Sequence, residues 1–366
     1  MKEIIINQPR VSYYIGGAEM LSMDHARFLC LKGYKVRLFT INPYSVKLQY
    51  SKRYLKFKND FADKIKFIEI NLKSKHWSIY NTLPGEDRYR WNYESIVYSS
   101  IFSNIVNKFK IKITIISYYI LDAIGVNSDL ITNCLYLCGV PREIDIFQGS
   151  FLYPYNRLIA ITNEVKMYWQ QFTSRIISVV SSGVDIERFY FYNSRKEINK
   201  ILYLGRILKR KGIEAFLDLA CLFGDKNNNL RFEVVGDGPN LERYKAGFNE
   251  KIKFVGNVDD PEKYLMENDV IICFSEYGEG LQGVILEAMA TGCLVIATRT
   301  EINSSLLSNG GGILVDYDFD DLVKSVRGIL NMKISYVNQM RINARKIIED
   351  KYSWDVKINE LIEVIE

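Results

Sequence analysis

The amino-acid sequence predicts an α/β protein built from two Rossmann-like domains in tandem. Short apolar runs alternate with longer helix-like segments along the whole chain, which is typical of parallel sheets with helical connections. The alternation starts again near residue 200, after a polar stretch over residues 192–200. A length of 366 residues also suits two domains of ordinary size better than a single small one.

The strands are predicted from their apolar runs. In the first half these runs are Glu3–Asn7, Lys35–Thr40, Lys66–Ile70, Ile113–Ser117, Asn133–Leu137 and Arg157–Ala160. In the second half they are Lys200–Leu204, Arg231–Val235, Ile252–Val255, Val270–Phe274, Leu294–Thr298 and Gly312–Val315. The expected helices include Ala18–Lys32, Leu241–Gly247, Pro261–Asn268, Val284–Thr291, Asp320–Leu330 and Trp354–Glu366. Gly33 follows the first of these helices, where glycine commonly ends a helix.

The restart near residue 200 sets the expected domain boundaries. We expect an N-terminal domain over residues 1–183 and a C-terminal domain over residues 184–349, with a hinge around Ser181–Lys200. The segment 350–366 contains the final helix, which we expect to return across the hinge to the first domain. The crevice between two such domains is then the expected place for a ligand.

The composition excludes several classes of protein. No run reaches the roughly 18–20 apolar residues that a membrane-spanning helix needs. The six cysteines lie in apolar runs without a CxxC pair, which predicts buried thiols rather than disulfides or zinc ligands. His25 and His76 are the only histidines, which argues against a His-rich metal site. The N-terminal MKEIIINQPR reads as a buried first strand rather than a signal peptide, so we expect a cytoplasmic protein.

Residues 42–66 form the most basic stretch, with seven Lys or Arg against two Asp, interleaved with aromatic residues. One interpretation is a solvated helix face over core aromatics. The other is a surface that contacts an anionic membrane at its cytoplasmic face, or a polyanionic acceptor. Nucleic acid is not expected as a partner, because no recognition motif accompanies the charge.

The segment EGLQGVILEAMATG carries the most specific chemistry. It follows the apolar run Val270–Phe274, and a helix is expected to open near Gln282 and Gly283. A helix N-terminus after a parallel strand is suited to anions, because its unpaired N–H groups point at the ligand. Glu279 and Glu287 flank that point, and carboxylates accept hydrogen bonds from hydroxyl groups rather than bind phosphate. Phosphate flanked by hydroxyl-bearing groups describes a sugar nucleotide.

Two cations and two glycine-containing loops follow other predicted strands. Arg206 and Lys211 lie on the loop after Lys200–Leu204, where open α/β sheets bind ligands, and both can contact phosphate oxygens. Gly16-Gly17 follows the first strand and lets the backbone approach a phosphate or sugar, although it lacks a GxGxxG fingerprint. The loop Gly256-Asn257-Val258 could offer backbone groups to a nucleobase.

Clustered aspartates are interpreted as structural. Asp237 lies in a Gly-Asp-Gly-Pro turn, which is turn chemistry before it is a metal ligand. Asp316, Asp318, Asp320 and Asp321 precede an amphipathic helix, so helix capping explains them better than a metal does.

These residues together resemble the retaining glycosyltransferases of the GT-B fold, in particular their large fourth sequence family, and the resemblance covers nearly the whole chain. The most specific match is the E-x7-E motif from Glu279 to Glu287. Further matches are LGR…KG at Arg206 and Lys211, GG-x-E at Gly16 to Glu19, GVD-x3-F at Gly183 to Phe189, and YSW at Tyr352 to Trp354. They occur in the order and at the spacing of the family.

The resemblance implies a role for each matched residue. The first glutamate, Glu279, would meet the donor sugar, and Glu287 would hold the ribose hydroxyls. Backbone N–H groups over Leu281, Gln282 and Gly283 would meet the diphosphate, which Arg206 and Lys211 would clamp. Two positions depart from the family pattern. Gly139 stands where many relatives carry a histidine that contacts the donor sugar, and Leu281 replaces a more usual aromatic residue.

The resemblance implies transfer of a hexosyl unit from a UDP- or GDP-linked sugar to a hydroxyl of a glycan or lipid-linked acceptor. The transfer would retain the anomeric configuration and need no metal or other cofactor, with the donor held by the second domain in a deep interdomain cleft. Three alternatives remain open: a non-catalytic nucleotide-sugar-binding paralogue, a GT-B sugar-nucleotide epimerase, and a tandem Rossmann oxidoreductase, which the lack of GxGxxG disfavours.

Overall fold

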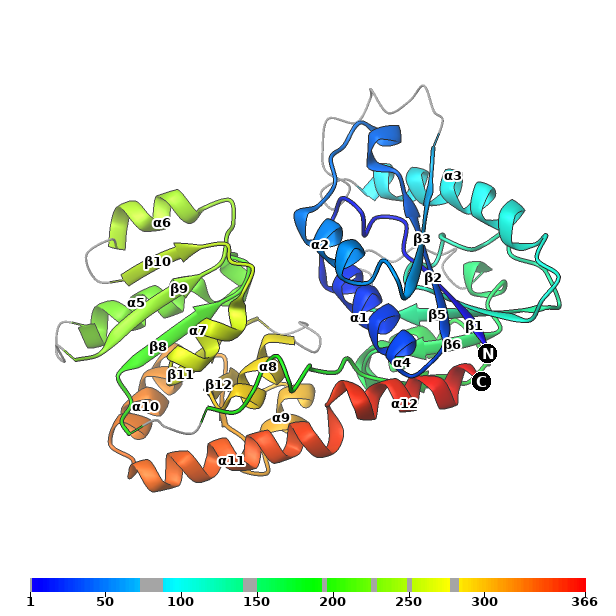
Figure 1. Ribbon diagram of the computed structural model, residues 1–366. Coiled ribbons are helices and arrows are strands. Elements are labelled where there is room, and N and C mark those ends of the chain that lie inside the picture. The colour runs from blue at the N-terminus through cyan, green and yellow to red at the C-terminus, as the bar shows by residue number, and fades with distance from the viewer. Residues whose placement is uncertain are drawn as a thin grey trace. The chain divides into compact units, whose positions relative to one another are not determined.

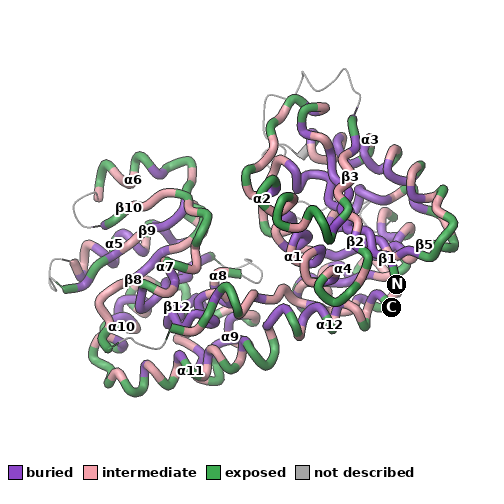
Figure 2. The backbone as a smooth tube through the Cα atoms, viewed as in Figure 1, coloured by how far each residue is buried: buried purple, intermediate pink, exposed green. Residues whose placement is uncertain are grey.

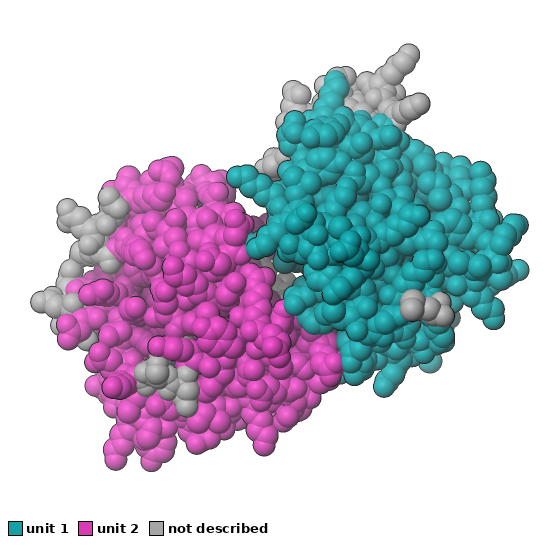
Figure 3. Space-filling view, in the orientation of Figure 1, with its two compact units in different colours: residues 1–181, 358–366 teal, residues 182–357 magenta. Residues whose placement is uncertain are grey.

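Figure 1 shows a computed structural model of the chain. The structure describes residues 2–72, 88–140, 150–192, 196–224, 229–248, 252–276 and 283–366. The chain divides into two compact units, residues 1–181 with 358–366, and residues 182–357, which Figure 3 shows in teal and magenta. The deep cleft expected between the two units stays a prediction.

The first unit is built on a parallel sheet of seven strands in the order β3-β2-β1-β4-β5-β6-β7. Its strands are β1 (Glu3–Asn7), β2 (Lys35–Ile41), β3 (Ile65–Ile70), β4 (Ile113–Ser117), β5 (Ile131–Leu137), β6 (Arg157–Ala160) and β7 (Ile177–Val179). Its helices are α1 (Gly17–Leu31), α2 (Lys52–Asp60), α3 (Arg88–Val106) and α4 (Asn163–Gln170), with short 3₁₀ turns at Pro43–Val46 and Ser150–Leu152.

The central strands of this sheet are covered on both faces, which explains why they read as continuous apolar runs. Every residue of β1 is buried (Figure 2). Ile5 joins a core cluster with Phe39 of β2, and this cluster also contains Tyr98 and Phe102 of α3. The strand alternation sends the side chains of Ile4 and Ile6 to the opposite face.

The second unit is a parallel sheet of six strands in the order β10-β9-β8-β11-β12-β13. Its strands are β8 (Lys200–Leu204), β9 (Arg231–Val235), β10 (Ile252–Gly256), β11 (Val270–Cys273), β12 (Leu294–Thr298) and β13 (Ile313–Val315). Its helices are α5 (Ile213–Gly224), α6 (Leu241–Phe248), α7 (Pro261–Glu267), α8 (Gly283–Thr291), α9 (Glu301–Leu307), α10 (Phe319–Leu330) and α11 (Ile334–Lys351), with a 3₁₀ turn at Lys209–Lys211.

Alternate strand residues of the second unit feed two separate cores. Ile201 of β8 lies in a cluster with Phe216 of α5 and Val326 of α10. The next residue, Leu202, lies in the other cluster, together with Leu286 of α8. Burial on both faces therefore positions α8, which carries half of the expected donor motif, directly against the sheet.

The last helix, α12 (Trp354–Ile365), continues from the second unit, and its residues from Ile358 onward belong to the first unit. Within that unit the backbone carbonyl of Val364 accepts a hydrogen bond from Arg157 at 2.5 Å, and Glu366 forms an ion pair with Lys2 at 2.9 Å. The two chain ends consequently lie side by side (Figure 1). No helix among the described residues is long and apolar enough to cross a membrane.

The predicted α/β fold is confirmed, and every strand expected from the sequence is found within two residues of its expected bounds. The expected helices are also found within about the same margin, and Gly33 follows α1 with a positive φ of 88°. The sequence analysis missed β7, because its three residues include Ser178 and do not form an unbroken apolar run.

Candidate functional site

The strand order reverses between β8 and β11 in the second unit. From β8 the chain moves outward to β9 and β10, and then returns to place β11 on the other side of β8. Open α/β sheets bind ligands at the carboxyl ends of the strands beside such a reversal, because the loops there diverge to opposite faces. The loops after β8 and β11 therefore define the candidate site.

The loop after β8 carries both predicted cations. Arg206 is exposed, and its backbone carbonyl accepts a hydrogen bond from the hydroxyl of Tyr203 at 2.7 Å. Lys211 is half-buried at the end of the 3₁₀ turn. Burial raises the pKa of the Cys273 thiol to about 12, and the Lys211 ammonium opposes that shift. Lys211 thus acts electrostatically at the carboxyl end of β11.

The loops after β8 and β11 pack backbone against backbone. Gly212 has a φ of 76°, and a Cβ on it would lie 1.9 Å from the carbonyl oxygen of Phe274, so no other residue fits there. The N–H of Glu276 donates to the carbonyl of Arg210 at 2.9 Å. This contact positions the cationic loop against the segment that leads into α8.

The Gly-Asp-Gly-Pro turn after β9 packs against the cationic loop in the same way. Gly236 has a φ of 140°, and a Cβ on it would lie 1.9 Å from the carbonyl oxygen of Gly205. The N–H of Ile207 donates to the carbonyl of Asp237 at 2.9 Å, and the Asp237 side chain accepts from the N–H of Gly238 at 2.7 Å. Asp237 is therefore a turn residue, as predicted.

The loop Gly256-Asn257-Val258 lies at the outer end of the same carboxyl edge. The carbonyl of Gly256 accepts a hydrogen bond from the N–H of Gly236 at 2.8 Å. Asn257 is exposed, whereas Val258 packs against the apolar core of the unit. Of the three, Asn257 is thus the one whose side chain could reach a ligand.

Helix α8 opens at Gly283, where the sequence predicts it, and Glu287 lies on its second turn. Beyond its own helix and chain neighbours, no atom of the described residues lies within 4 Å of where a Cβ at Gly283 would be, so these residues leave the first N–H groups of the helix approachable. Glu279, Leu281 and Gln282 lie outside the described residues. The structure thus brings Arg206, Lys211 and the start of α8 to one edge of the sheet.

Arg345 of α11 holds the other end of α8. Its guanidinium donates at 2.9 Å to the carbonyl of Ala290 in α8 and at 2.9 Å to the carbonyl of Phe189. A cation at a helix C-terminus satisfies carbonyls that have no partner in the helix. The sequence analysis missed this residue, because an arginine in a polar helix carries no signal of such a contact.

The aspartates before α10 have the structural role that the sequence predicts. Asp318 caps α10 by accepting a hydrogen bond from the N–H of Asp321 at 2.9 Å, and Asp316 forms an ion pair with Arg299 at 3.0 Å. Among the described residues, no group of three His, Cys, Asp or Glu side chains could hold a metal ion.

In the first unit the strand order reverses between β1 and β4, and Gly16-Gly17 lies on this edge at the start of α1. The N–H of Gly16 donates to the carboxylate of Glu19 at 3.1 Å. Burial raises the pKa of Glu19, and the nearby Arg10 guanidinium opposes the shift. The space above Gly17 is open, so a ligand can approach the backbone at that position.

A buried charge network supports this second edge. The Arg10 guanidinium reaches both carboxylate oxygens of Asp122 at 3.2 and 3.3 Å, and both side chains are fully buried. Arg10 also donates to Ser95 at 3.0 Å and lies 3.9 Å from the ring centroid of Trp91. Burial alone would lower the pKa of Arg10, but Asp122 and other nearby acidic groups hold it above its usual value. The sequence offered no signal for this pair, because its partners are 112 residues apart.

The comparisons with known proteins come from the sequence and from the fold. Residues 198–332 match the family described as glycosyl transferases group 1. An uncharacterized glycosyltransferase of Methanocaldococcus jannaschii is 29% identical over 232 residues, covering 57% of this chain and 58% of the relative. An α-1,4-N-acetyl-D-galactosaminyltransferase of Campylobacter jejuni is 26% identical over 207 residues, covering 54% of this chain and 57% of the relative. The chain thus spans somewhat more than half the length of these relatives.

Solved structures match over the whole chain. A glycosyltransferase of Rickettsia africae has a TM-score of 0.75 at 17% identity, covering 100% of this chain and 98% of the other. The Anabaena protein HepE, solved in complex with UDP, has a TM-score of 0.73 at 15% identity, covering 99% of both chains. The fold is GT-B. The sequence and fold comparisons together support a glycosyltransferase of this fold.

Gly139 is one of the two positions at which the sequence departs from the pattern of the family that it resembles. Gly139 follows β5 and is exposed, and apart from its chain neighbours no atom of the described residues lies within 4 Å of where its Cβ would be. Its carbonyl accepts a hydrogen bond from the indole of Trp169 at 3.1 Å. His25 is buried beneath Tyr118, with its Nδ1 2.7 Å from the tyrosine hydroxyl, and burial lowers its pKa to about 3. A neutral, enclosed imidazole cannot replace a side chain at the exposed position 139, and His76 lies outside the described residues.

The basic stretch 42–66 has buried or paired residues on one side and exposed lysines on the other. Tyr54 is fully buried, and Lys58 forms an ion pair with Glu69 at 2.7 Å. Lys47, Lys52 and Lys56 are exposed. Helix α2 therefore packs its aromatic face inward, as the first interpretation of the sequence expects, and presents the remaining lysines outward.

Proposed function

We propose that the protein is a retaining glycosyltransferase that transfers a hexosyl unit from a nucleoside diphosphate sugar to a hydroxyl of a glycan or glycolipid. The observation that carries the proposal is the convergence of Arg206, Lys211 and the start of α8 at the strand-order reversal of the region that matches glycosyl transferases group 1. The UDP and UDP-glucose in the HepE structures support the donor class. The full name of the Campylobacter enzyme includes an acceptor glycan on diphospho-undecaprenol, and a relative from Mycobacterium tuberculosis is named phosphatidyl-myo-inositol mannosyltransferase; both names support a lipid-linked acceptor.

The proposed chemistry depends on stabilising the leaving group. As the bond between the anomeric carbon and the diphosphate breaks, negative charge grows on the diphosphate oxygens. Arg206, Lys211 and the N-terminal N–H groups of α8 would stabilise that charge, so a metal ion is not required. The acceptor hydroxyl would attack the same face of the sugar and pass its proton to an oxygen of the leaving diphosphate, which gives retention without a protein nucleophile. Glu279 would bind the transferred sugar and Glu287 the ribose hydroxyls.

A non-catalytic nucleotide-sugar-binding protein is the second candidate. It is favoured by Gly139, because no side chain at this position can contact the donor sugar as the family histidine does. Under this candidate the donor edge of the second unit keeps its role in binding, while turnover is lost.

Product analysis with a panel of UDP- and GDP-linked hexoses separates the two candidates. We expect release of nucleoside diphosphate that depends on added glycan or glycolipid, with the hexose recovered in α-linkage from an α-linked donor. Replacing Glu279 with alanine should abolish transfer while nucleotide affinity stays within a few-fold. Nucleotide binding without transfer to any acceptor would favour the binding protein. A changed sugar within the nucleotide would instead identify an epimerase, and full activity of Glu279→Ala would refute the assigned site.

We also propose that the outward lysines of α2 contact an anionic membrane surface, which would bring a lipid-linked acceptor to the enzyme. Lys52 and Lys56 lie one turn apart on one helix face, and the exposed apolar Leu55 lies beside them. Each lysine near an anionic surface contributes about 1 kcal/mol to membrane attraction. Lys58 is excluded from this surface, because its ammonium is already paired with Glu69.

Reversing the charge at Lys47, Lys52 and Lys56 tests the membrane contact. We expect the triple glutamate variant to lose most of its binding to vesicles that contain phosphatidylserine, with binding to neutral vesicles unchanged. The matched control reverses the exposed Lys108, Lys110 and Lys112, which lie beyond the end of α3. Equal losses in both variants would mean that net charge alone drives binding, and unchanged binding in the first would leave α2 as a solvated face.

A further inference from the structure

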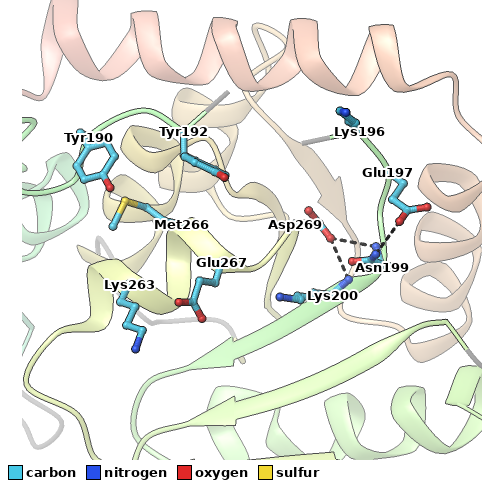
Figure 4. Close-up of a pocket in the computed structure, with 10 residues that line it drawn as sticks. All are labelled: Tyr190, Tyr192, Lys196, Glu197, Asn199, Lys200, Lys263, Met266, Glu267 and Asp269. Carbon is cyan, nitrogen blue, oxygen red and sulfur yellow. Dashed lines mark hydrogen bonds between the residues drawn. The ribbon is translucent and has the colours of Figure 1, made fainter. Parts of the chain in front are cut away.

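The second unit contains a cavity that the donor site does not use. It has a volume of about 620 Å³, and Figure 4 shows the residues that line it. Lys200 is the first residue of β8 and Asp269 immediately precedes β11, so the cavity lies at the amino ends of these strands. The candidate donor site lies at their carboxyl ends. Loops at one end of a strand cannot line a site at the other, so this cavity is a separate feature.

The floor of the cavity is polar, and its groups are joined by hydrogen bonds. The buried Asp269 carboxylate accepts hydrogen bonds from the backbone N–H groups of Asn199 and Lys200, each at 3.0 Å. The Asn199 side chain in turn donates to Glu197 at 2.9 Å. The carbonyl of Asp269 accepts from Arg341 of α11 at 3.3 Å. These contacts hold the start of β8 and the start of β11 in one arrangement before any ligand binds.

Aromatic and apolar side chains form the opposite wall. Tyr190 and Tyr192 project from the segment before β8, and Figure 4 shows Tyr190 beside Met266 of α7. The two tyrosines are 52% and 44% exposed, although aromatic rings of this size are ordinarily buried more deeply. Exposed rings beside ordered polar groups are typical of a ligand surface that is apolar on one side and hydrogen-bonding on the other.

The charges on the lining balance. Three lysines (Lys196, Lys200 and Lys263) face three carboxylates (Glu197, Glu267 and Asp269). Within the described part of the chain, the three ammonium groups and the Glu267 carboxylate have no hydrogen bond or ion pair. The carboxylates would repel an anionic ligand, and the lysines would repel a cationic one. A hydroxyl group both donates and accepts hydrogen bonds, so it can bond to both kinds of side chain.

We propose that this cavity binds sugar rings of a neutral oligosaccharide. The apolar faces of the rings would lie on Tyr190 and Tyr192, and their hydroxyls would bond to the lysines and to Glu267. The volume falls in the range of about 300–1,000 Å³ that is typical of small-ligand sites. The proposal rests on the proposed glycosyltransferase function only for the source of the glycan, since binding at this cavity requires no transfer.

Titration of the full-length protein with maltotetraose, cellotetraose and chitotetraose tests the proposal. We expect at least one of them to bind with a Kd of about 1 mM, and a Tyr190→Ala/Tyr192→Ala variant to bind it about tenfold more weakly. Lys263→Met combined with Glu267→Met should also weaken binding, because it removes one donor and one acceptor group without changing the net charge. Tyr336→Ala is the matched control, since Tyr336 is a 64% exposed tyrosine on α11 outside the lining and should leave binding unchanged.

The same titration is repeated with saturating UDP, which occupies the proposed donor site, and with the Lys211→Ala variant. Binding that persists in both locates the oligosaccharide away from the donor edge, whether or not the protein transfers sugar. The proposal is overturned if none of the three oligosaccharides binds, or if the double tyrosine variant binds as well as the unaltered protein. It is also overturned if inorganic pyrophosphate competes for the cavity, or if the tyrosines instead control self-association in sedimentation experiments.

Discussion

Replacing Lys211 with alanine is expected to lower kcat of hexosyl transfer by about 10²–10³-fold, the cost of removing one group that stabilises developing charge in a transition state. Lys211 belongs to the short turn that Gly212 packs against the loop after β11, so its ammonium acts at the carboxyl end of β11. The diphosphate gains most of its charge as the glycosidic bond breaks. The loss should therefore appear in kcat more than in KM for the donor.

Lys209 provides the matched control for this prediction. It lies two residues away in the same turn and forms an exposed ion pair with Glu214 at 3.5 Å, with 77% of its side chain accessible. Lys209→Ala should change kcat by less than about threefold, because an exposed charge is screened by water. Steady-state kinetics with a saturating acceptor measure both variants. Equal effects of the two substitutions would show that the turn contributes only general positive charge.

Substitutions of Arg206 test the same site in a second way. A guanidinium can bond two phosphate oxygens at once, whereas an ammonium acts as a point charge. Arg206→Lys should therefore recover only part of the activity that Arg206→Ala loses. Full recovery by lysine would mean that charge alone matters at this position.

Replacing Arg10 with methionine is expected to destabilise the first unit by about 3–5 kcal/mol, because the buried Asp122 carboxylate loses its compensating charge. Both side chains are fully buried, and the pair joins the segment after β1 to the segment after β4. The double variant Arg10→Met/Asp122→Leu should recover much of that loss, since it leaves no unpaired charge. This recovery distinguishes a charge effect from a simple loss of packing.

Urea unfolding measures the Arg10 variants, with Arg188→Met as the control. Arg188 forms a more exposed ion pair with Glu262 at 2.8 Å in the second unit, and its loss should cost about 0–1 kcal/mol. Because the chain has two compact units, tryptophan fluorescence is read together with far-UV circular dichroism to separate two transitions. A small effect of Arg10→Met, or no recovery in the double variant, would show that the buried pair does not stabilise the unit.

The variants of Lys211 and Arg206 should change activity but not stability, whereas the variants of Arg10 should change stability. Lys211 and Arg206 lie on a loop whose backbone is held by contacts between glycines and neighbouring carbonyls, so truncating their side chains leaves those contacts intact. Arg10, in contrast, lies within the folded interior. For the loop variants we expect a lower kcat without a shift in urea unfolding. For Arg10→Met we expect a shift in urea unfolding without a lower kcat.

The sequence was informative wherever neighbouring residues carry the signal. The strands of both sheets could be predicted because burial on two faces demands unbroken apolar runs such as Ile4 to Ile6. The turn at Asp237 and the cap at Asp318 could be predicted because their bonds join residues one to three positions apart. Helix α8 could be placed because Gly283 opens an apolar run, Val284 to Leu286, that follows an apolar strand.

What only the tertiary structure decided depends on residues far apart in the chain. The Arg10–Asp122 pair spans 112 residues, and Arg345 bonds carbonyls that lie 55 and 156 residues away. The cavity at the amino ends of β8 and β11 likewise brings Tyr190 and Asp269 together. The exposed lysines of α2 could be distinguished from Lys58 only in the structure, because Lys58 pairs with Glu69. By itself the sequence determined the two α/β units and the order of their motifs, because periodic burial and turn chemistry are local. The supporting charges and the second cavity were decided by folding, because long-range pairing leaves no trace in local spacing.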